Sequence, residues 1–143
     1  MSKKFNSAEV INGTFGKVWV NNELVANTKS FEAKISIDYE DINVSNNLAT
    51  QSKMTGYSIT GTMTLHKVDS QFIKLYANGL KTGDLPSAKV IAALDDPASK
   101  GTERVELTDV YFDEIQLSKF ENKTITEEEV PFRAGGHRIL QTI

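Results

Sequence analysis

Hydrophobic and polar residues alternate along two stretches of this chain, and an irregular segment separates them. From Phe31 to Tyr39 every second residue is apolar, while the residues between them are charged or polar. From Tyr57 to Lys67 apolar residues alternate with serine and threonine over most of the stretch. A period of two is typical of a strand with one buried face. The pattern therefore predicts two strands with a break between them.

The break spans residues 40–56 and carries the most information in the sequence. It contains three asparagines and has no sustained period. Most hairpin connections need roughly two to five residues, and longer loops are usually functional or disordered. A simple connection would also not need the isolated apolar residues of this segment, which are Ile42, Val44, Leu48 and Met54. We predict a long, mobile loop that becomes ordered when these four side chains contact another molecule.

Shorter strands are expected on both sides of this pair. Residues 15–25 are typical of a hairpin, because Asn21 and Asn22 suit the positive φ angles of a tight type I′ turn. Residues 89–94 and 126–132 predict further strands, the last ended by the glycines of residues 134–136.

A β-bulge is predicted in the strand that begins at Glu103. Val105 and Leu107 share one parity, whereas Val110 and Phe112 share the other. One extra residue near Thr108 and Asp109 would return all four side chains to one face of the sheet.

One helix interrupts the strands, over residues 69–79. Asp69 or Ser70 suits the N-cap, and apolar residues recur at helical spacing from Phe72 to Tyr76. Gly79 is expected to follow the last turn, with Leu80 just beyond it.

Together these elements predict one mainly β domain over residues 1–143. We expect a two-sheet β-sandwich or barrel with one short flanking α-helix and a long inter-strand loop.

Composition narrows the classes of function. A net charge of -3 argues against general binding to nucleic acid backbones, and the absence of cysteine excludes disulfides, thiolate zinc sites and cysteine nucleophiles. No stretch is long and apolar enough for a signal peptide or a membrane span, so we expect a protein that is not secreted by a signal peptide and has no membrane partner. The acidic excess lies in the last third, where residues 101–143 carry nine acidic and five basic side chains.

Candidate chemical residues are few. His66 and His137 have no partners at metal-ligand or catalytic spacing, and Asp95 and Asp96 precede a proline in an expected turn. We therefore predict no enzyme, no catalytic or metal-binding residue and no cofactor. Two interpretations stay open for Glu127, Glu128 and Glu129. They are either a cation site or contact for a basic partner, or a charged edge that resists wrong strand pairing. Strand parity places Glu128 on the opposite face from its two neighbours.

Several short segments resemble one family when their order is considered. They are Lys29-Ser30-Phe31-Glu32-Ala33, residues 54–62 with His66-Lys67-Val68, Leu94-Asp95-Asp96, residues 101–105, Asp109-Val110, Phe112-Asp113 and residues 127–132. Over residues 10–133 the chain resembles the tail tube proteins of contractile phage tails, of the type found in PBSX-like defective prophages and phage-tail-like bacteriocins.

This resemblance implies a structural role. It implies a barrel-like sandwich that assembles as stacked hexameric rings into an inner tail tube conducting DNA or ions, and a residue 40–56 loop that reaches a neighbouring subunit. Expected partners are copies of the chain itself and the tail sheath, tape-measure and baseplate proteins, with DNA as a non-specific passenger. Glu127 to Glu129 become candidate lumen or inter-ring charges. The expected location is the host cytoplasm during assembly, and then the virion or tail-like particle.

Two other classes of function are weighed against this one. A small-ligand-binding β-barrel would need an apolar cavity, with Trp19 or Tyr57 in its wall. A hydrolytic enzyme would need a convergent group of acid and base side chains, which the sequence does not offer.

Overall fold

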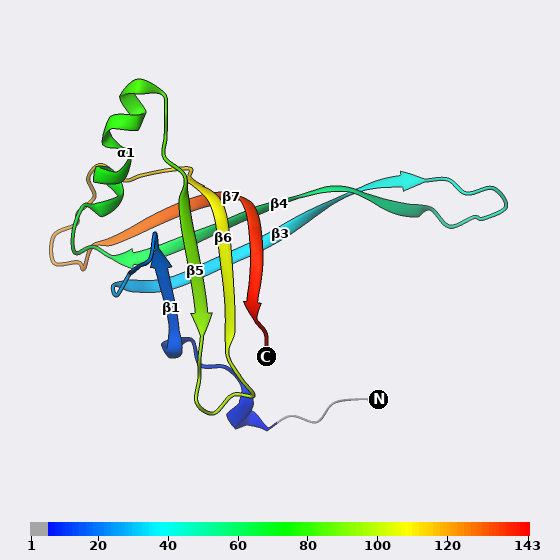
Figure 1. Ribbon diagram of the computed structural model, residues 1–143, viewed down its shortest axis with the longest axis horizontal. Coiled ribbons are helices and arrows are strands. Elements are labelled where there is room, and N and C mark those ends of the chain that lie inside the picture. Colours follow the sequence, from blue (N-terminus) through cyan, green and yellow to red (C-terminus); the bar gives the residue numbers. More distant parts are fainter. Residues whose placement is uncertain (1–5) are drawn as a thin grey trace.

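The protein is built mainly from β-strands that form a body and a long projecting hairpin (Figure 1). The computed structural model describes residues 6–143. Residues 1–5, which belong to the N-terminal stretch expected not to be a signal peptide, lie outside the described residues. The strands are β1 (Gly16–Val20), β2 (Glu23–Leu24), β3 (Thr28–Ile42), β4 (Gln51–His66), β5 (Ala88–Leu94), β6 (Glu103–Phe112) and β7 (Glu127–Gln141). The helices are α1 (Gln71–Thr82) and the 3-10 turns η1 (Ser7–Glu9) and η2 (Gly13–Phe15).

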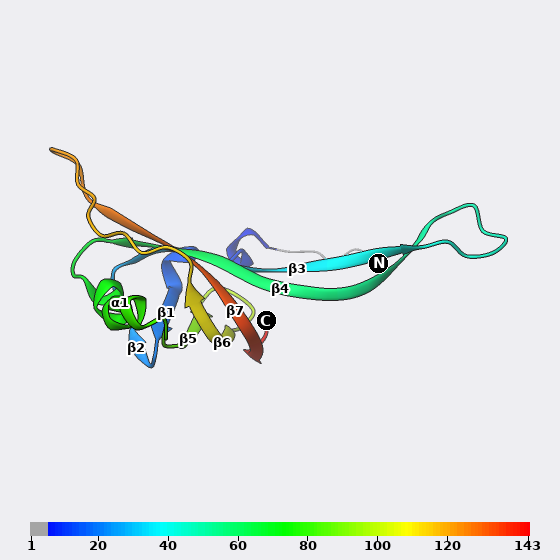
Figure 2. The ribbon, with the colours of Figure 1, turned by 90° about the horizontal axis from the view of Figure 1, so that it is seen from above.

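All seven strands belong to one antiparallel sheet with the order β2-β1-β5-β6-β7-β4-β3. The first half of β7 pairs with β4, from Glu127 to Ala134, and its second half continues alongside β6 to Gln141. Seen from above, β3 and β4 form one layer and β1, β5 and β6 lie in another (Figure 2). The mainly β prediction is confirmed, and the two expected layers are parts of one bent sheet.

The core lies where these layers face each other, and Phe132 of β7 is fully buried in it. Its ring stacks on that of Phe31 from β3, with 5.7 Å between the ring centroids. The other fully buried apolar side chains come from several elements and include Met63, Leu65, Phe72, Tyr76, Val90, Val110 and Val130.

Helix α1 covers one end of the core, but its predicted end at Gly79 is wrong. The helix continues to Thr82 and ends at Gly83, whose φ of 82° is left-handed and whose N–H donates to the Gly79 carbonyl. Gly79 lies inside the helix because a Cβ there would come within 2.7 Å of the Asp84 carbonyl oxygen. Gly79 therefore allows the chain at Asp84 to pack closely against the helix, and it does not end the helix.

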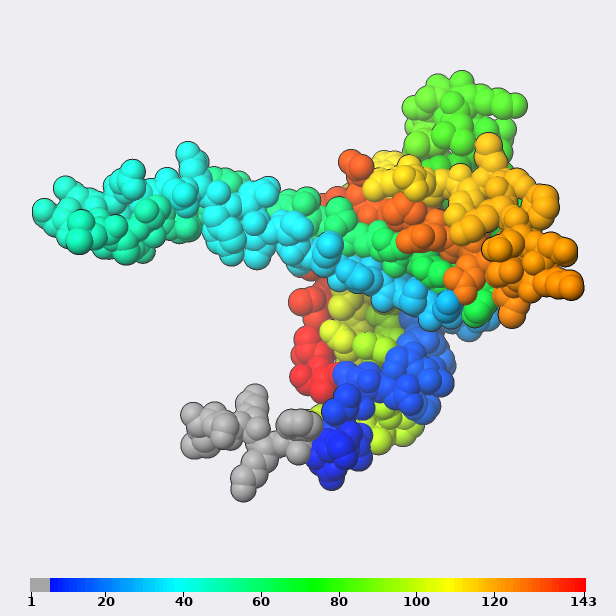
Figure 3. All heavy atoms as spheres, turned by 180° about the vertical axis from the view of Figure 1, so that it is seen from behind, coloured from blue at the N-terminus to red at the C-terminus, as the bar shows by residue number. Residues whose placement is uncertain are grey.

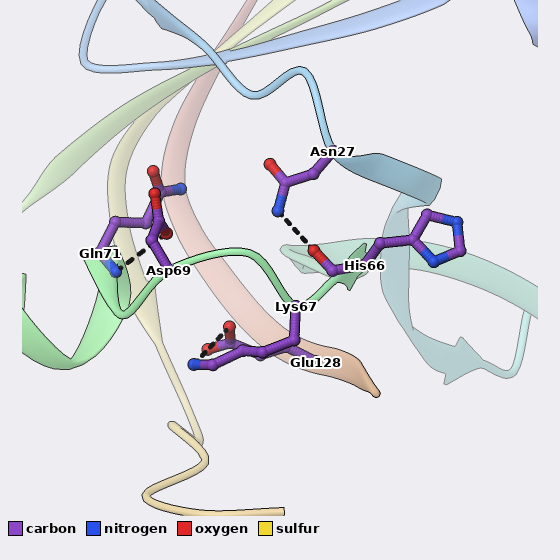
Figure 4. Close-up of polar contacts among 6 residues, drawn as sticks. All are labelled: Asn27, His66, Lys67, Asp69, Gln71 and Glu128. Atoms are coloured by element: carbon purple, nitrogen blue, oxygen red, sulfur yellow. Dashed lines mark hydrogen bonds and ion pairs between the residues drawn. The ribbon is translucent and has the colours of Figure 1, made fainter. Parts of the chain in front are cut away.

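Two specific contacts hold α1 in place. Asp69 accepts a hydrogen bond from the Gln71 N–H at the start of the helix (Figure 4). Near its middle, the Tyr76 hydroxyl accepts a 2.8 Å hydrogen bond from the Phe112 N–H. Burial of that hydroxyl raises the pKa of Tyr76.

The turn and the bulge predicted from sequence are confirmed. Asn21 and Asn22 both have positive φ, 51° and 69°, between β1 and β2. Between β5 and β6 the pairing moves from Ala88 with Val110 to Val90 with Leu107, so β6 carries one extra residue. Asp109 has a φ of 50° at this bulge.

The predicted end of the last strand at residues 134–136 is wrong, since β7 runs through them to Gln141. A Cβ at Gly136 would lie only 2.6 Å from the Thr108 hydroxyl oxygen, and a Cβ at Gly135 would lie 3.1 Å from the Asp109 Cβ. The glycines therefore let β7 pass the bulge of β6 without interrupting the pairing.

The predicted loop of residues 40–56 is also much shorter in the structure. Strand β3 continues to Ile42 and β4 begins at Gln51, which leaves residues 43–50 as the connection. A bulge changes the register from Asp38 with Gly56 to Tyr39 with Met54. The extra residue, Thr55, lies in β4 and breaks the period of two there, so alternation alone does not predict the first residues of β4.

The core assignment predicts different effects for two phenylalanines. Phe132→Ala should lower the free energy of unfolding by about 3–5 kcal/mol, because it leaves a cavity among packed side chains. Phe120→Ala, at a side chain that is 86% exposed, should change it by less than about 0.5 kcal/mol. Urea unfolding of the unassembled protein measures both values, and similar losses would contradict this core.

Candidate assembly surface

The outer halves of β3 and β4 form a two-stranded ribbon that leaves the body, and we call residues 35–58 the arm (Figure 1). Pairing of β4 with β7 stops at Ile59, so Gln51 to Ser58 has a backbone partner only in β3. The space-filling view shows the arm projecting beyond the rest of the molecule (Figure 3). An isolated two-stranded ribbon is marginally stable in water, so the arm is suited to gaining a partner.

One face of the arm is apolar and open to solvent. Ile35, Ile37 and Tyr39 pair in register with Ile59, Tyr57 and Met54, and of these six only Ile59 is buried. Tyr39 is 62% exposed and Met54 is 50% exposed. The alternation of apolar and polar residues predicted a strand with one buried face. In the arm the alternation continues, but the body does not extend far enough to bury the apolar face.

The opposite face of the arm is polar. It carries Ser36, Asp38 and Ser58 where the apolar face carries Ile35, Ile37 and Tyr57. The difference between the faces gives the arm a defined side for an apolar contact.

The four predicted contact residues are all exposed but do not form one cluster. Met54 lies on the apolar face opposite Tyr39, and Ile42 has the other parity at the end of β3. Val44 and Leu48 lie in the tip, where the Asn47 side-chain oxygen accepts a hydrogen bond from the Ala49 N–H. Leu48 is completely exposed. Pattern alone missed Tyr39 and Ile37 as contact candidates because alternating apolar residues predict burial in the body.

The acidic run is divided between two environments. Glu127 forms a 2.6 Å ion pair with Lys29 at the surface, and this hydrogen bond lowers the pKa of Glu127. Glu129 is exposed. Glu128 is 3% exposed, so the expectation of a lumen or inter-ring charge is wrong for this residue, because strand parity turns its side chain toward the interior.

Glu128 instead belongs to an internal ion pair. Its Oε2 lies 3.3 Å from the Lys67 ammonium, and Figure 4 shows the Lys67 side chain running beside it while the His66 ring points away. The backbone next to Lys67 is also held, since the Asn27 side chain donates to the His66 carbonyl. The ion pair joins the segment between β4 and α1 to β7, and it has a structural role.

A second exposed apolar surface was not predicted. Residues 113–126, which we call the end loop, connect β6 to β7 without a helix or strand. Leu117, Phe120 and Ile125 in this loop are 81%, 86% and 78% exposed. Loops of this length are uncommon unless they are functional or disordered. The length of the loop, together with its isolated apolar residues, could have indicated this surface from the sequence.

The other chemical candidates have structural surroundings. Asp96 is buried and accepts hydrogen bonds from the N–H groups of Asn12 and Ala98. Within residues 6–143 no group of three or more His, Asp or Glu side chains is placed to hold a metal ion. In the same part of the chain, none of the helices has the length and apolar character needed to cross a bilayer.

A cleft of about 520 Å³ lies between β3 and strands β1, β5 and β6. Its lining includes Val18, Phe31 and Leu107, but not Trp19 or Tyr57. The Trp19 ring instead lies under the Arg104 guanidinium, with 5.4 Å from the Arg104 Cζ to the ring centroid.

The amino-acid sequence is similar to one protein family and to two individual proteins. The profile of a family described as "Phage tail tube protein" matches residues 3–140. The phage-like element PBSX protein XkdM and the uncharacterized protein YqbM, both from Bacillus subtilis (strain 168), are each 38% identical to the chain over 124 residues. Each of these matches covers 85% of the chain and 84% of the relative.

Solved structures show the same fold. A chain in the extended PVC sheath-tube complex of an extracellular contractile injection system superimposes with a TM-score of 0.75, covering 99% of this chain and 100% of that one at 12% identity. A Bacillus subtilis protein of known structure is 34% identical, with a TM-score of 0.53 over 90% of this chain and 93% of that one.

The two ion pairs of the acidic run predict unequal effects on stability. Lys67→Met should lower the free energy of unfolding by roughly 2–4 kcal/mol, because it leaves the buried Glu128 carboxylate without a partner. Lys29→Met should leave it nearly unchanged, because water screens the exposed Glu127. Chemical unfolding measures both variants.

A third variant separates loss of the charge pair from loss of packing. Adding Glu128→Leu to Lys67→Met removes the lone buried charge, and it should recover most of the lost stability. A double variant no more stable than Lys67→Met alone would contradict the ion-pair explanation.

Proposed function

Because the chain belongs to the phage tail tube protein family, we propose that it assembles as stacked hexameric rings into the inner tube of a contractile tail-like particle. The tube would conduct DNA or ions. The observation that carries this proposal is the arm, whose apolar face has no cover in the isolated chain. A neighbouring copy would bury that face.

Free backbone edges support self-assembly as well. Strand β3 lies at one edge of the sheet and pairs only with β4 along its length. The outer part of β4 and the C-terminal part of β7 each lack one neighbour after the two strands separate. Such edges are templates for pairing with another chain. Contacts between two different surfaces close a ring when the rotation between copies permits it.

We assign the subunit contacts to the arm. Leu48, Val44 and Ile42 would be buried at its tip, and Met54 would be buried with Tyr39 on its apolar face. Buried apolar anchors near the centre of an interface contribute most of its affinity. We propose that residues 1–143 form one domain of the subunit.

Glu127 and Glu129 are proposed as charges of the lumen or of the surface between rings. An acidic lumen would repel phosphate and let DNA pass without binding. The proposed partners beyond the chain itself are the sheath, tape-measure and baseplate proteins. The role is structural and not enzymatic, first in the host cytoplasm and then in the particle.

The cleft beside β3 is the one observation that favours a small-ligand-binding β-barrel. Its volume of about 520 Å³ is within the range of ligand sites. Negative-stain microscopy of concentrated protein distinguishes the two functions. Rings or tubes support the tail tube, whereas uniform small particles at every concentration would overturn it.

The arm makes a specific prediction about assembly. Leu48→Ser combined with Met54→Ser should leave the melting temperature of the unassembled protein within about 2 °C of the native value, because neither side chain packs in the core. The same variant should lose most of its polymerisation, measured by sedimentation and microscopy. Leu80→Ser, at another exposed apolar residue on α1, is the matched control and should polymerise normally.

The acidic charges predict a dependence on salt. If Glu127 and Glu129 of neighbouring copies lie close together, higher ionic strength should increase polymerisation by screening their repulsion. Glu129→Gln should then polymerise better than the native chain at low salt. Light scattering measures both effects, and polymerisation that is insensitive to salt and to this substitution would contradict the assignment.

A further inference from the structure

The layer of β1, β5 and β6 has an outer side that faces away from β3 and β4 (Figure 2). On these strands Val18, Val90 and Leu107 are buried in the core, so the residues next to them point outward. Together with the adjoining end of β7, this side carries four cations and two acids, which are Lys17, Lys89, Arg104, Arg138, Glu106 and Asp109. We call this surface the basic face, because its net charge is +2 whereas the net charge of the whole chain is -3.

Three apolar side chains lie in a row across the basic face. Leu24 of β2 pairs with Trp19 of β1, and Trp19 pairs with Ile91 of β5, so adjacent strands place the three side by side. Leu24 is 52% exposed, and the other two are half-buried. Lys17 and Lys89 each precede a member of the row by two residues, and because β1 and β5 are antiparallel, these lysines lie on opposite sides of the row. Apolar surface between two cations is complementary to an apolar side chain between two acids.

Arg104 adds a third cation, which is held in place by the Trp19 ring. The Arg104 Cζ lies 5.4 Å from the centroid of that ring, a distance at which the ring face attracts a guanidinium. Within residues 6–143 the Arg104 side chain has no ion pair or hydrogen bond, and its Nε is buried without a partner. Glu106 on the same face is already paired with Arg138 at 3.0 Å. The guanidinium is therefore oriented and available to bind a carboxylate through two parallel N–H groups.

We propose that the basic face binds an acidic segment of another protein. An apolar side chain of that segment packs on Leu24 and Ile91. Carboxylates on both sides of it pair with Lys17, Lys89 and Arg104. This contact goes beyond the proposed self-assembly and does not depend on it, because all of these residues belong to one copy of the chain.

An acidic protein segment fits this face better than a nucleic acid does. Single-stranded nucleic acids bind by stacking their bases on aromatic rings, and the Arg104 guanidinium already lies over the Trp19 ring. A long run of phosphates would also extend beyond the basic face onto a chain of net charge -3, which repels it. Phosphates would gain nothing from the apolar row, whereas a peptide side chain would bury it.

The position of Trp19 allows a direct test, because it is the only tryptophan in the chain. The probe is a synthetic peptide with one leucine between two pairs of glutamates, added to dilute, unassembled protein at low salt. We expect a saturable change in tryptophan emission and a matching heat of binding by calorimetry. The same peptide with glutamine in place of glutamate should give neither, because it cannot form the charge-assisted hydrogen bonds.

Three substitutions test which cations carry the binding. Arg104→Gln should weaken binding of the glutamate peptide about tenfold, because it removes a hydrogen-bonded charge pair. Lys17→Gln should weaken binding several-fold while leaving Arg104 on Trp19, so it serves as the test if Arg104→Gln does not fold by circular dichroism. The matched control is Lys81→Gln, which removes the same charge from the exposed end of α1 and should bind as the native chain does.

Each alternative result would overturn this inference. A native chain that gives no saturable signal with the glutamate peptide has no such site, and equal weakening by Lys81→Gln would show a general attraction between charges. Tighter binding of oligothymidylate, weakened by the same substitutions, would assign the face to nucleic acid. Emission that changes with protein concentration alone would assign it to a second copy of the chain. The presence or absence of rings and tubes tests only the proposed function.

Discussion

The fold depends on the double pairing of β7. At Phe132 this strand pairs with Gly61 of β4 on one side and with Phe112 of β6 on the other. Only a short part of β7 is paired on both sides, so the two groups of strands diverge from it and enclose the core. Gly61 is required there because a Cβ would overlap the Phe132 ring and the Glu32 carbonyl oxygen. The bend of the sheet and the packing of its central aromatic residue therefore have one cause.

The same divergence creates the assembly surface. Once β7 has left β4, the arm has no third strand and no opposing layer, and its apolar face remains open. A monomeric protein would lose little by shortening these strands. Retaining 15 and 16 residues in β3 and β4 is reasonable if the missing cover comes from another copy. The subunit can thus be regarded as an incomplete fold whose remaining apolar burial occurs on assembly.

The charged residues contribute in proportion to their burial. Lys67 and Glu128 form a pair inside the body, where loss of either partner leaves a charge in a poor solvent. Lys29 and Glu127 form their pair at the surface, where solvent weakens their attraction. Neighbouring glutamates in one acidic run therefore have different roles, one in stability and the others at the surface.

The sequence by itself determined the local backbone structure. Alternation predicted the strands, Asn21 and Asn22 predicted the tight turn, and the change of parity at Thr108 and Asp109 predicted the bulge, because each depends on neighbours along the chain. The tertiary structure decided what depends on distant residues: whether Gly79 and Gly136 end an element or admit a close neighbour, and where the arm leaves its cover. Backbone proximity and burial are set by strands far apart in sequence, and a pattern of residues does not contain those distances.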